Sequence, residues 1–135
     1  MTNAVYPKAK QTALGPGLNL SAGAVKAVLV HTAIYTYSAA HQFLSDVSAG
    51  ARVGAAVTLS SKTLTDGVFD AADISVTGLV SAPSVEAIVL YVDTGVEGTS
   101  PLVAYIDTSS GLPVAAGATQ VDVTWDNGTN RIFKL

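Results

Sequence analysis

The sequence contains no cysteine among its 135 residues, and this absence excludes a disulfide framework and any metal site built from thiolates. Charged residues are also scarce, at 13% of the chain, which is about half the usual share. The seven Lys and Arg residues are spread thinly along a chain of net charge −3. Binding to nucleic acid needs a basic patch, so we expect no nucleic-acid partner.

Long hydrophobic runs are missing as well. The longest charge-free apolar runs, such as 27–30 and 87–92, stop far short of the roughly 20 residues that a membrane-spanning helix needs. The N-terminus has no basic segment followed by an apolar block, which is the pattern of a secretory signal. We therefore expect synthesis in the cytoplasm and no membrane partner.

The residues that are abundant are small and apolar or hydroxylated. Hydrophobic residues make up 49% of the chain, mostly Ala and Val, and Ser and Thr are the main polar complement. This balance excludes disorder and favours β-structure with hydroxyl-rich outer faces. The length fits one domain. Such a neutral surface is typical either of a plain β-domain or of a protein packed against neighbours.

The first 17 residues differ from the rest of the chain. They show no clear period, and Gly15-Pro16-Gly17 closes the stretch. We interpret 1–17 as an N-terminal arm and 18–135 as a single β-domain. The arm contains Tyr6 and Leu14, so it is too apolar for a simple linker, and we expect it to pack on its own domain or on a neighbour.

Alternation of apolar and polar residues predicts strands along most of the remaining chain. Asp66-Gly67 predicts a tight turn within one of them, and Asp126 to Gly128 predicts a turn into a C-terminal hairpin. The fold class is therefore mainly β, a small antiparallel β-sandwich or barrel with extended terminal arms. The predicted strands are 24–32, 51–59, 63–69, 73–80, 85–93, 102–107, 120–125 and 131–135, with 85–93 central and 102–107 its hairpin partner.

One segment has a helical pattern. Ser38 is a good N-cap, and Ala40, Phe43, Leu44 and Val47 recur at helical spacing. The sequence therefore predicts one short helix from Ser38 to Val47.

Residues with catalytic or metal-binding chemistry do not form a recognisable constellation. His31 and His41 are fewer than the usual set of zinc ligands, and we interpret them as surface or interface residues. The spacing of Asp66, Asp70 and Asp73 does not match an EF-hand loop, so turn capping is the favoured role. The sequence has neither a nucleophile elbow nor a phosphate-binding loop. We expect no enzyme activity, no cofactor and no metal.

Five stretches, which cover most of the chain, resemble a family of small virion structural proteins of tailed bacteriophages. They are AVKAVLVHTAIYTYSAAHQFLSDV, DGVFDAADISV, VEAIVLYVDTG, PLVAYIDTSSGLPV and the ending VTWDNGTNRIFKL. This resemblance implies a capsid decoration (cement) protein that binds the major capsid protein and stabilises the head. It also implies a location on the capsid surface of the virion. No functional residues come with the resemblance.

The partner-binding residues are therefore sought in the two chain ends. Tyr6 and Leu14 in the lead-in, and Arg131 and Phe133 in the tail, are large residues where the chain could extend beyond its own sheet. The alternative for the tail is that it is the last strand of that sheet. We also expect self-association, with a trimer favoured.

A second hypothesis is a tail or head-fibre component that binds a host-surface polysaccharide or receptor. Aromatic rings would then stack on the ligand, or else they are core residues. The candidate rings are Tyr35, Tyr37, Tyr91, Tyr105 and Trp125.

Overall fold

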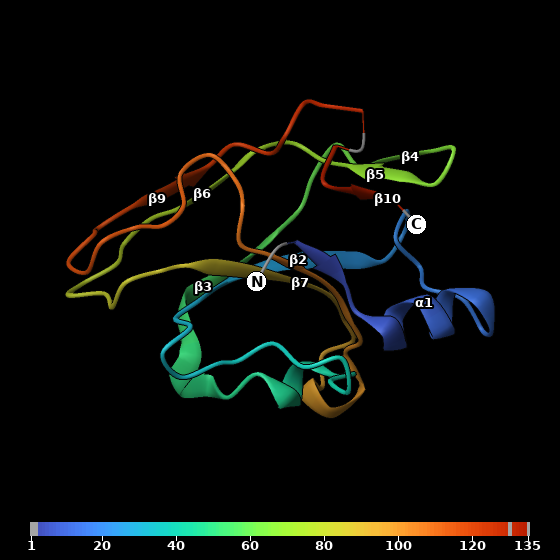
Figure 1. Cartoon of the computed structure of the whole chain (residues 1–135), viewed down its shortest axis with the longest axis horizontal. Helices are drawn as coiled ribbons and strands as arrows, with labels where there is room; N and C mark the ends of the chain where they lie inside the picture. The colour runs from blue at the N-terminus through green and yellow to red at the C-terminus, as the bar shows by residue number, and fades with distance from the viewer. Residues whose placement is uncertain (1–2, 130, 135) are drawn as a thin grey trace.

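The computed structural model describes residues 3–129 and 131–134, and the described chain forms ten strands and one α-helix (Figure 1). This mainly β architecture with one short helix confirms the expected fold class. None of the described helices is long and apolar enough to cross a membrane. The elements are β1 (Ala4–Val5), α1 (Pro7–Leu14), β2 (Ala24–Val30), β3 (Arg52–Thr58), β4 (Thr63–Thr65), β5 (Val68–Asp70), β6 (Ile74–Val76), β7 (Ala87–Asp93), β8 (Leu102–Ile106), β9 (Val121–Val123) and β10 (Phe133–Lys134), with 3₁₀ turns at Leu44–Asp46, Ala49–Ala51 and Glu97–Thr99.

Five strands form one large antiparallel sheet in the order β1-β8-β7-β2-β3. Strand β7 lies in the middle and pairs with β2 along its whole length, from Ala24 opposite Asp93 to Val30 opposite Ala87. Its other neighbour is β8, so the prediction of a central strand with a hairpin partner is confirmed. Almost every residue of β7 is buried because both faces of this sheet are covered.

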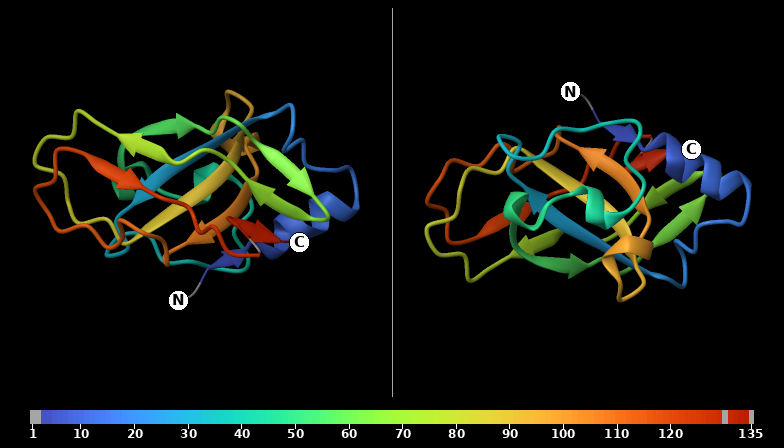
Figure 2. Two further views of the ribbon diagram at one scale, coloured as in Figure 1. Left: turned by 90° about the horizontal axis from the view of Figure 1, so that it is seen from above. Right: turned by 90° about the horizontal axis from the view of Figure 1, so that it is seen from below.

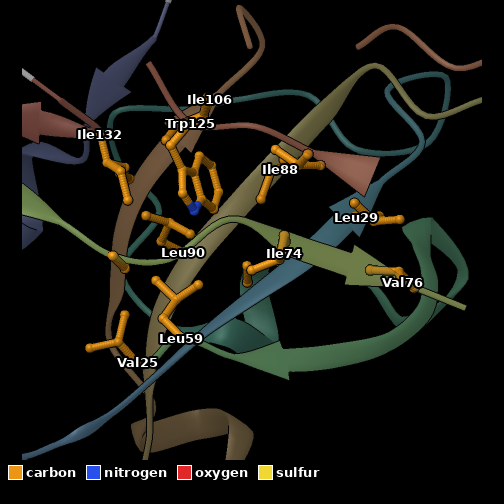
Figure 3. Close-up of a cluster of buried hydrophobic side chains, with 14 of the residues drawn as sticks. Val25, Leu29, Leu59, Ile74, Val76, Ile88, Leu90, Ile106, Trp125 and Ile132 are labelled. Atoms are coloured by element: carbon orange, nitrogen blue, oxygen red, sulfur yellow. The ribbon is translucent and has the colours of Figure 1, made fainter. Parts of the chain in front are cut away.

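The upper face of the large sheet is covered by two small sheets, β10-β5-β4 and β6-β9 (Figures 1 and 2). Side chains from the two layers interdigitate in an aliphatic core, in which the Trp125 ring lies among Leu90, Ile88 and Ile106 (Figure 3). Face-to-face packing of this kind defines a sandwich. The core is built from sequence-distant strands that each contribute alternate residues.

The lower face is covered by the segment 31–51 and by α1 (Figure 2). Strand β2 shows the alternation that separates the two cores. Val25 and Leu29 pack in the upper core, whereas Val28 and Val30 pack in the lower one. Successive side chains of this strand therefore point to opposite faces of the sheet, as in a regular strand.

The position predicted for the helix is wrong. The α-helix is Pro7–Leu14, where Pro7 supplies the fixed φ favoured at a first helical position. Within 38–47 only Leu44–Asp46 is helical, as a 3₁₀ turn. The backbone there bonds to distant partners instead, since the Leu44 N–H donates to the Ser100 carbonyl at 2.8 Å.

The first described residues are not an extended arm but pack on their own domain, which is one of the two placements expected for the N-terminal segment. Strand β1 is an edge strand of the large sheet, and the Tyr6 N–H donates to the Val103 carbonyl at 3.0 Å. The Tyr6 side chain is fully buried in the lower core. Residues 4–14 are therefore part of the β-body, because burial of Tyr6 and Ala9 favours packing over extension.

The C-terminal hairpin predicted between 120–125 and 131–135 does not form, although Leu135 lies outside the described residues. Strand β9 pairs with β6, and β10 pairs with β5 with Phe133 opposite Phe69. The chain crosses between the small sheets because Trp125 is anchored in the core. The tight turn at Asp66-Gly67 is confirmed, with positive φ at both residues as a two-residue hairpin between β4 and β5 requires.

Candidate binding surfaces

The structure separates the four partner-binding candidates into two buried and two exposed residues. Tyr6 and Phe133 belong to the two cores, so their rings are not surface anchors. Leu14, at the end of α1, is 90% exposed, and Arg131 is exposed next to β10. The C-terminal tail contributes the last strand of its own domain, which is the alternative to a free arm, since β10 is an edge strand of a small sheet. Whether Leu14 or Arg131 binds a partner stays a prediction.

A groove of about 510 Å³ runs along the edge of the sandwich where the two chain ends meet. We call it the terminal groove. Strand β1 forms one wall, and β10 with the preceding residues forms another, so an edge strand of each layer borders it (Figure 1). Its lining residues are Asn3, Ala4, Val5, Lys10, Ala104, Tyr105, Ile106, Asp126, Arg131, Ile132, Phe133 and Lys134.

The charges that line the terminal groove are mostly positive. Lys10, Arg131 and Lys134 face a single carboxylate, Asp126. Lys10 and Lys134 form no ion pair within residues 3–129 and 131–134, and Arg131 lies 4.0 Å from Asp70. Outside the groove, Lys26 pairs with Asp93 at 2.8 Å and Arg52 with Glu97 at 2.7 Å. Among the described residues the groove therefore gathers three basic side chains against Asp126 and Asp70, on a chain whose net charge is negative.

A second feature is a cluster of tyrosines on the lower face. The Tyr6 and Tyr35 hydroxyls are 2.7 Å apart, and the Tyr35 hydroxyl is 2.8 Å from Nδ1 of His41. The Tyr37 ring packs against Tyr6 and Tyr105, with centroid distances of 5.1 and 5.4 Å. These contacts fasten the irregular segment 31–51 to the large sheet.

Burial changes the acid–base chemistry of this cluster. It is the largest cause of the raised pKa of Tyr6, and the hydrogen bond with Tyr35 adds to it. Burial also raises the pKa of Tyr35 to about 12, although its hydrogen bond with Tyr6 opposes the shift. Both phenols are therefore neutral hydrogen-bonding groups at physiological pH.

An open groove beside the tyrosine cluster has a different lining. It is bordered by the rings of Tyr35, Tyr37 and Tyr105, and by the carboxylate of Glu86. The Oε1 atom of Glu86 accepts hydrogen bonds from the Thr32 N–H and hydroxyl at 2.9 and 3.0 Å. Burial alone would raise the pKa of Glu86, but these bonds and one with Ser84 outweigh it and lower the pKa. Glu86 therefore holds the start of segment 31–51 as a carboxylate.

Four of the five rings proposed to stack on a polysaccharide lie in the core. Tyr35, Tyr91, Tyr105 and Trp125 are all buried, and only Tyr37 is partly exposed. Trp125 donates from Nε1 to the Ala72 carbonyl at 3.0 Å, as a buried indole requires. These four residues pack in the cores of this structure, although Tyr35 and Tyr105 also border the open groove beside the tyrosine cluster.

Three of the residues singled out in the sequence, His31, His41 and Asp73, have hydrogen-bond partners in the structure. His31 Nδ1 lies 2.8 Å from the Ser84 carbonyl and 3.4 Å from Glu86. Asp73 Oδ1 accepts the backbone N–H of Trp125 at 2.9 Å. No group of three His, Asp or Glu side chains in the described part of the chain is arranged to hold a metal ion.

Sequence reasoning missed Lys10 and Lys134. They lie near opposite ends of the sequence, and only the pairing of β1 with β8 and of β10 with β5 brings them to one groove. No local pattern signals this, because the two residues lie at opposite ends of the chain.

Comparison of the sequence with protein-family models and with curated proteins gives no match.

Proposed function

We propose that the chain is a non-enzymatic structural protein of a bacteriophage virion, a capsid decoration protein that binds the major capsid protein and stabilises the head. The segments that resemble phage virion proteins are those that build the body. They include the central strand β7 and the ending from Val123, which contributes Trp125 and β10. The resemblance therefore lies in the framework of the sandwich.

The observation that carries the proposal is an uneven distribution of charge along the molecule. Residues 74–85 and 108–121 contain no Lys, Arg, Asp or Glu. Much of these two stretches forms the end of the body around β6 and β9, whereas the terminal groove lies toward the end with α1 (Figure 1). The exposed Asp122 of β9 is also at this charge-poor end, and Val80 is 86% exposed there. A rigid module with one charge-poor end and one basic groove supports attachment to a protein lattice through two distinct contacts.

Self-association stays part of the proposal, with a trimer favoured. The exposed Val80 and Leu14 lie in the loop after β6 and at the end of α1. Isolated apolar residues of this kind contribute to an interface when a partner covers them.

The test is an add-back experiment with capsids that lack this protein. Purified protein is mixed with expanded capsids, and bound copies are counted after sedimentation and located by electron microscopy. A decoration protein gives saturable binding in hundreds of copies at lattice positions and raises the temperature at which the capsids open. Binding only at a vertex or on tail structures, in tens of copies or fewer, would support the fibre hypothesis instead.

A further inference from the structure

We propose that the terminal groove binds an extended, acidic polypeptide segment of the partner protein, which lies alongside β1. This inference rests on the proposed function, because it says where on this chain the partner is held and by which chemistry. It commits to one kind of occupant, and three features of the groove support that choice.

The first feature is the outer edge of β1, to which no other described strand is hydrogen-bonded. The Tyr6 N–H bonds to Val103, and Val5 is paired with Ala104. In an antiparallel pair, hydrogen-bonded and non-hydrogen-bonded residues alternate, so the N–H and C=O of Val5 point away from β8. These groups can pair with the backbone of an added strand, which is the way that exposed sheet edges bind extended peptides.

The second feature is the charge of the groove. Lys10 approaches from α1, Lys134 from β10 and Arg131 from the residues just before β10. Among the described residues they face the carboxylate of Asp126 and that of Asp70, which lies 4.0 Å from Arg131. An acidic segment would relieve their mutual repulsion and form charge-assisted hydrogen bonds with Arg131. The same charges reject a basic segment, so they also supply specificity.

The third feature is the shape of the lining. The volume of about 510 Å³ falls within the range of natural ligand sites, roughly 300–1,000 Å³. Ala4, Val5 and Ile132 line it between the charged residues, and the Ile132 side chain packs in the upper core. A segment that alternates acidic and aliphatic residues matches this lining, because successive side chains of a strand point to opposite sides. Nucleic acid fits less well, since the groove offers a strand edge and few aromatic faces.

The binding test uses an acetylated and amidated decapeptide of alternating Glu and Val, with a Lys and Val peptide as the control probe. We expect the acidic peptide to shift the amide resonances of Val5 and Lys134 in the isotope-labelled full chain and to slow hydrogen exchange at Val5. Lys10→Glu should weaken binding about tenfold. Lys8→Glu is the matched control, because Lys8 lies on the same helix but does not line the groove.

Several outcomes would overturn the inference. Equal binding of the two peptides, equal effects of Lys10→Glu and Lys8→Glu, or no shift at Val5 would each show that the groove is not the site. Tighter binding of a single-stranded oligonucleotide than of the acidic peptide would do the same. Lys134→Glu serves as a second groove variant if Lys10→Glu alters the thermal melting of the protein.

The capsid experiment separates this inference from the proposed function. If the wild-type protein decorates capsids and the Lys10→Glu variant decorates them equally well, the groove is not the attachment site although the function holds. If the wild-type protein does not bind capsids but the acidic peptide still binds at Val5, the proposed function fails and the groove is a peptide site of another kind.

Discussion

The two faces of the large sheet are covered in different ways. The upper face lies under two regular sheets, and its core is aliphatic apart from Trp125 and the stacked pair Phe69 and Phe133. The lower face lies under α1 and a segment with little regular structure, which side chains hold in place. Arg52 donates to the Val47 and Leu44 carbonyls, and Tyr35 links Tyr6 to His41.

The layers that cover the two faces satisfy their backbone hydrogen-bonding groups in different ways. A strand satisfies its backbone groups within the sheet, so the layer that covers the upper face needs only apolar side chains. An irregular segment leaves carbonyl and N–H groups unpaired, and Arg52 and Asp46 bond to them directly. The upper face should therefore depend on side-chain volume, and the lower face on individual polar atoms.

We expect the largest loss of stability from a substitution in the core above the large sheet. Trp125→Ala removes a buried indole and leaves a cavity over Leu90, which should lower the free energy of unfolding by about 3–5 kcal/mol. Urea unfolding followed by circular dichroism measures it. A loss below about 1 kcal/mol would mean that the upper layer collapses to fill the space.

An intermediate effect is expected from the tyrosine hydroxyls. Tyr35→Phe leaves the Tyr6 hydroxyl and Nδ1 of His41 without their shared partner, so it should lower the free energy of unfolding by about 1–3 kcal/mol. Tyr6→Phe removes only the end of the chain of bonds and should cost about 1 kcal/mol. Equal losses in the two variants, measured by thermal and urea unfolding, would show that the bond to His41 contributes nothing.

The smallest effect is expected on the pH dependence of the free energy of unfolding. The Gln42 N–H donates to Asp46 at 2.8 Å and is the main cause of the lowered pKa of this carboxyl, with the Phe43 N–H adding to it. Because the pKa is lower in the folded state, the stabilisation is present above the usual Asp value of about 3.9 and is lost as pH falls through the folded pKa. Asp46→Asn should remove this part of the acid sensitivity. The measurement is the free energy of unfolding of the wild type and of Asp46→Asn between pH 7 and pH 2. A constant difference between the two proteins over this range would contradict the prediction.

The parts of the fold that the sequence predicts are those fixed by local pattern. Strands β2, β7 and β8 follow from alternation and apolar runs, and the β4–β5 turn follows from Asp66-Gly67. Each of these signals lies within one strand or one turn. Period-2 alternation also places Val25 and Val28 correctly on opposite faces.

What the sequence does not predict depends on distant partners. Residues 38–47 have helical spacing, but Phe43 forms a bridge with Pro101 and so lies extended. Tyr6 looks like a terminal anchor until the pairing of β1 with β8 buries it. The terminal groove escapes sequence reasoning for the same reason, because its walls come from opposite ends of the chain.

Strands near both chain ends pair with strands that are distant in the sequence, and this determines the order in which the parts of the fold can assemble. Strand β1 pairs with β8, β6 with β9, and β5 with β10. Each of these pairs joins residues that are far apart in the sequence. Contacts of long sequence separation slow folding, because the entropy of closing the loop is lost before the contact forms. During synthesis on the ribosome the upper layer therefore stays open until Phe133 has emerged. Until then its apolar strands are exposed to solvent, where they are accessible to chaperones and to other nascent copies.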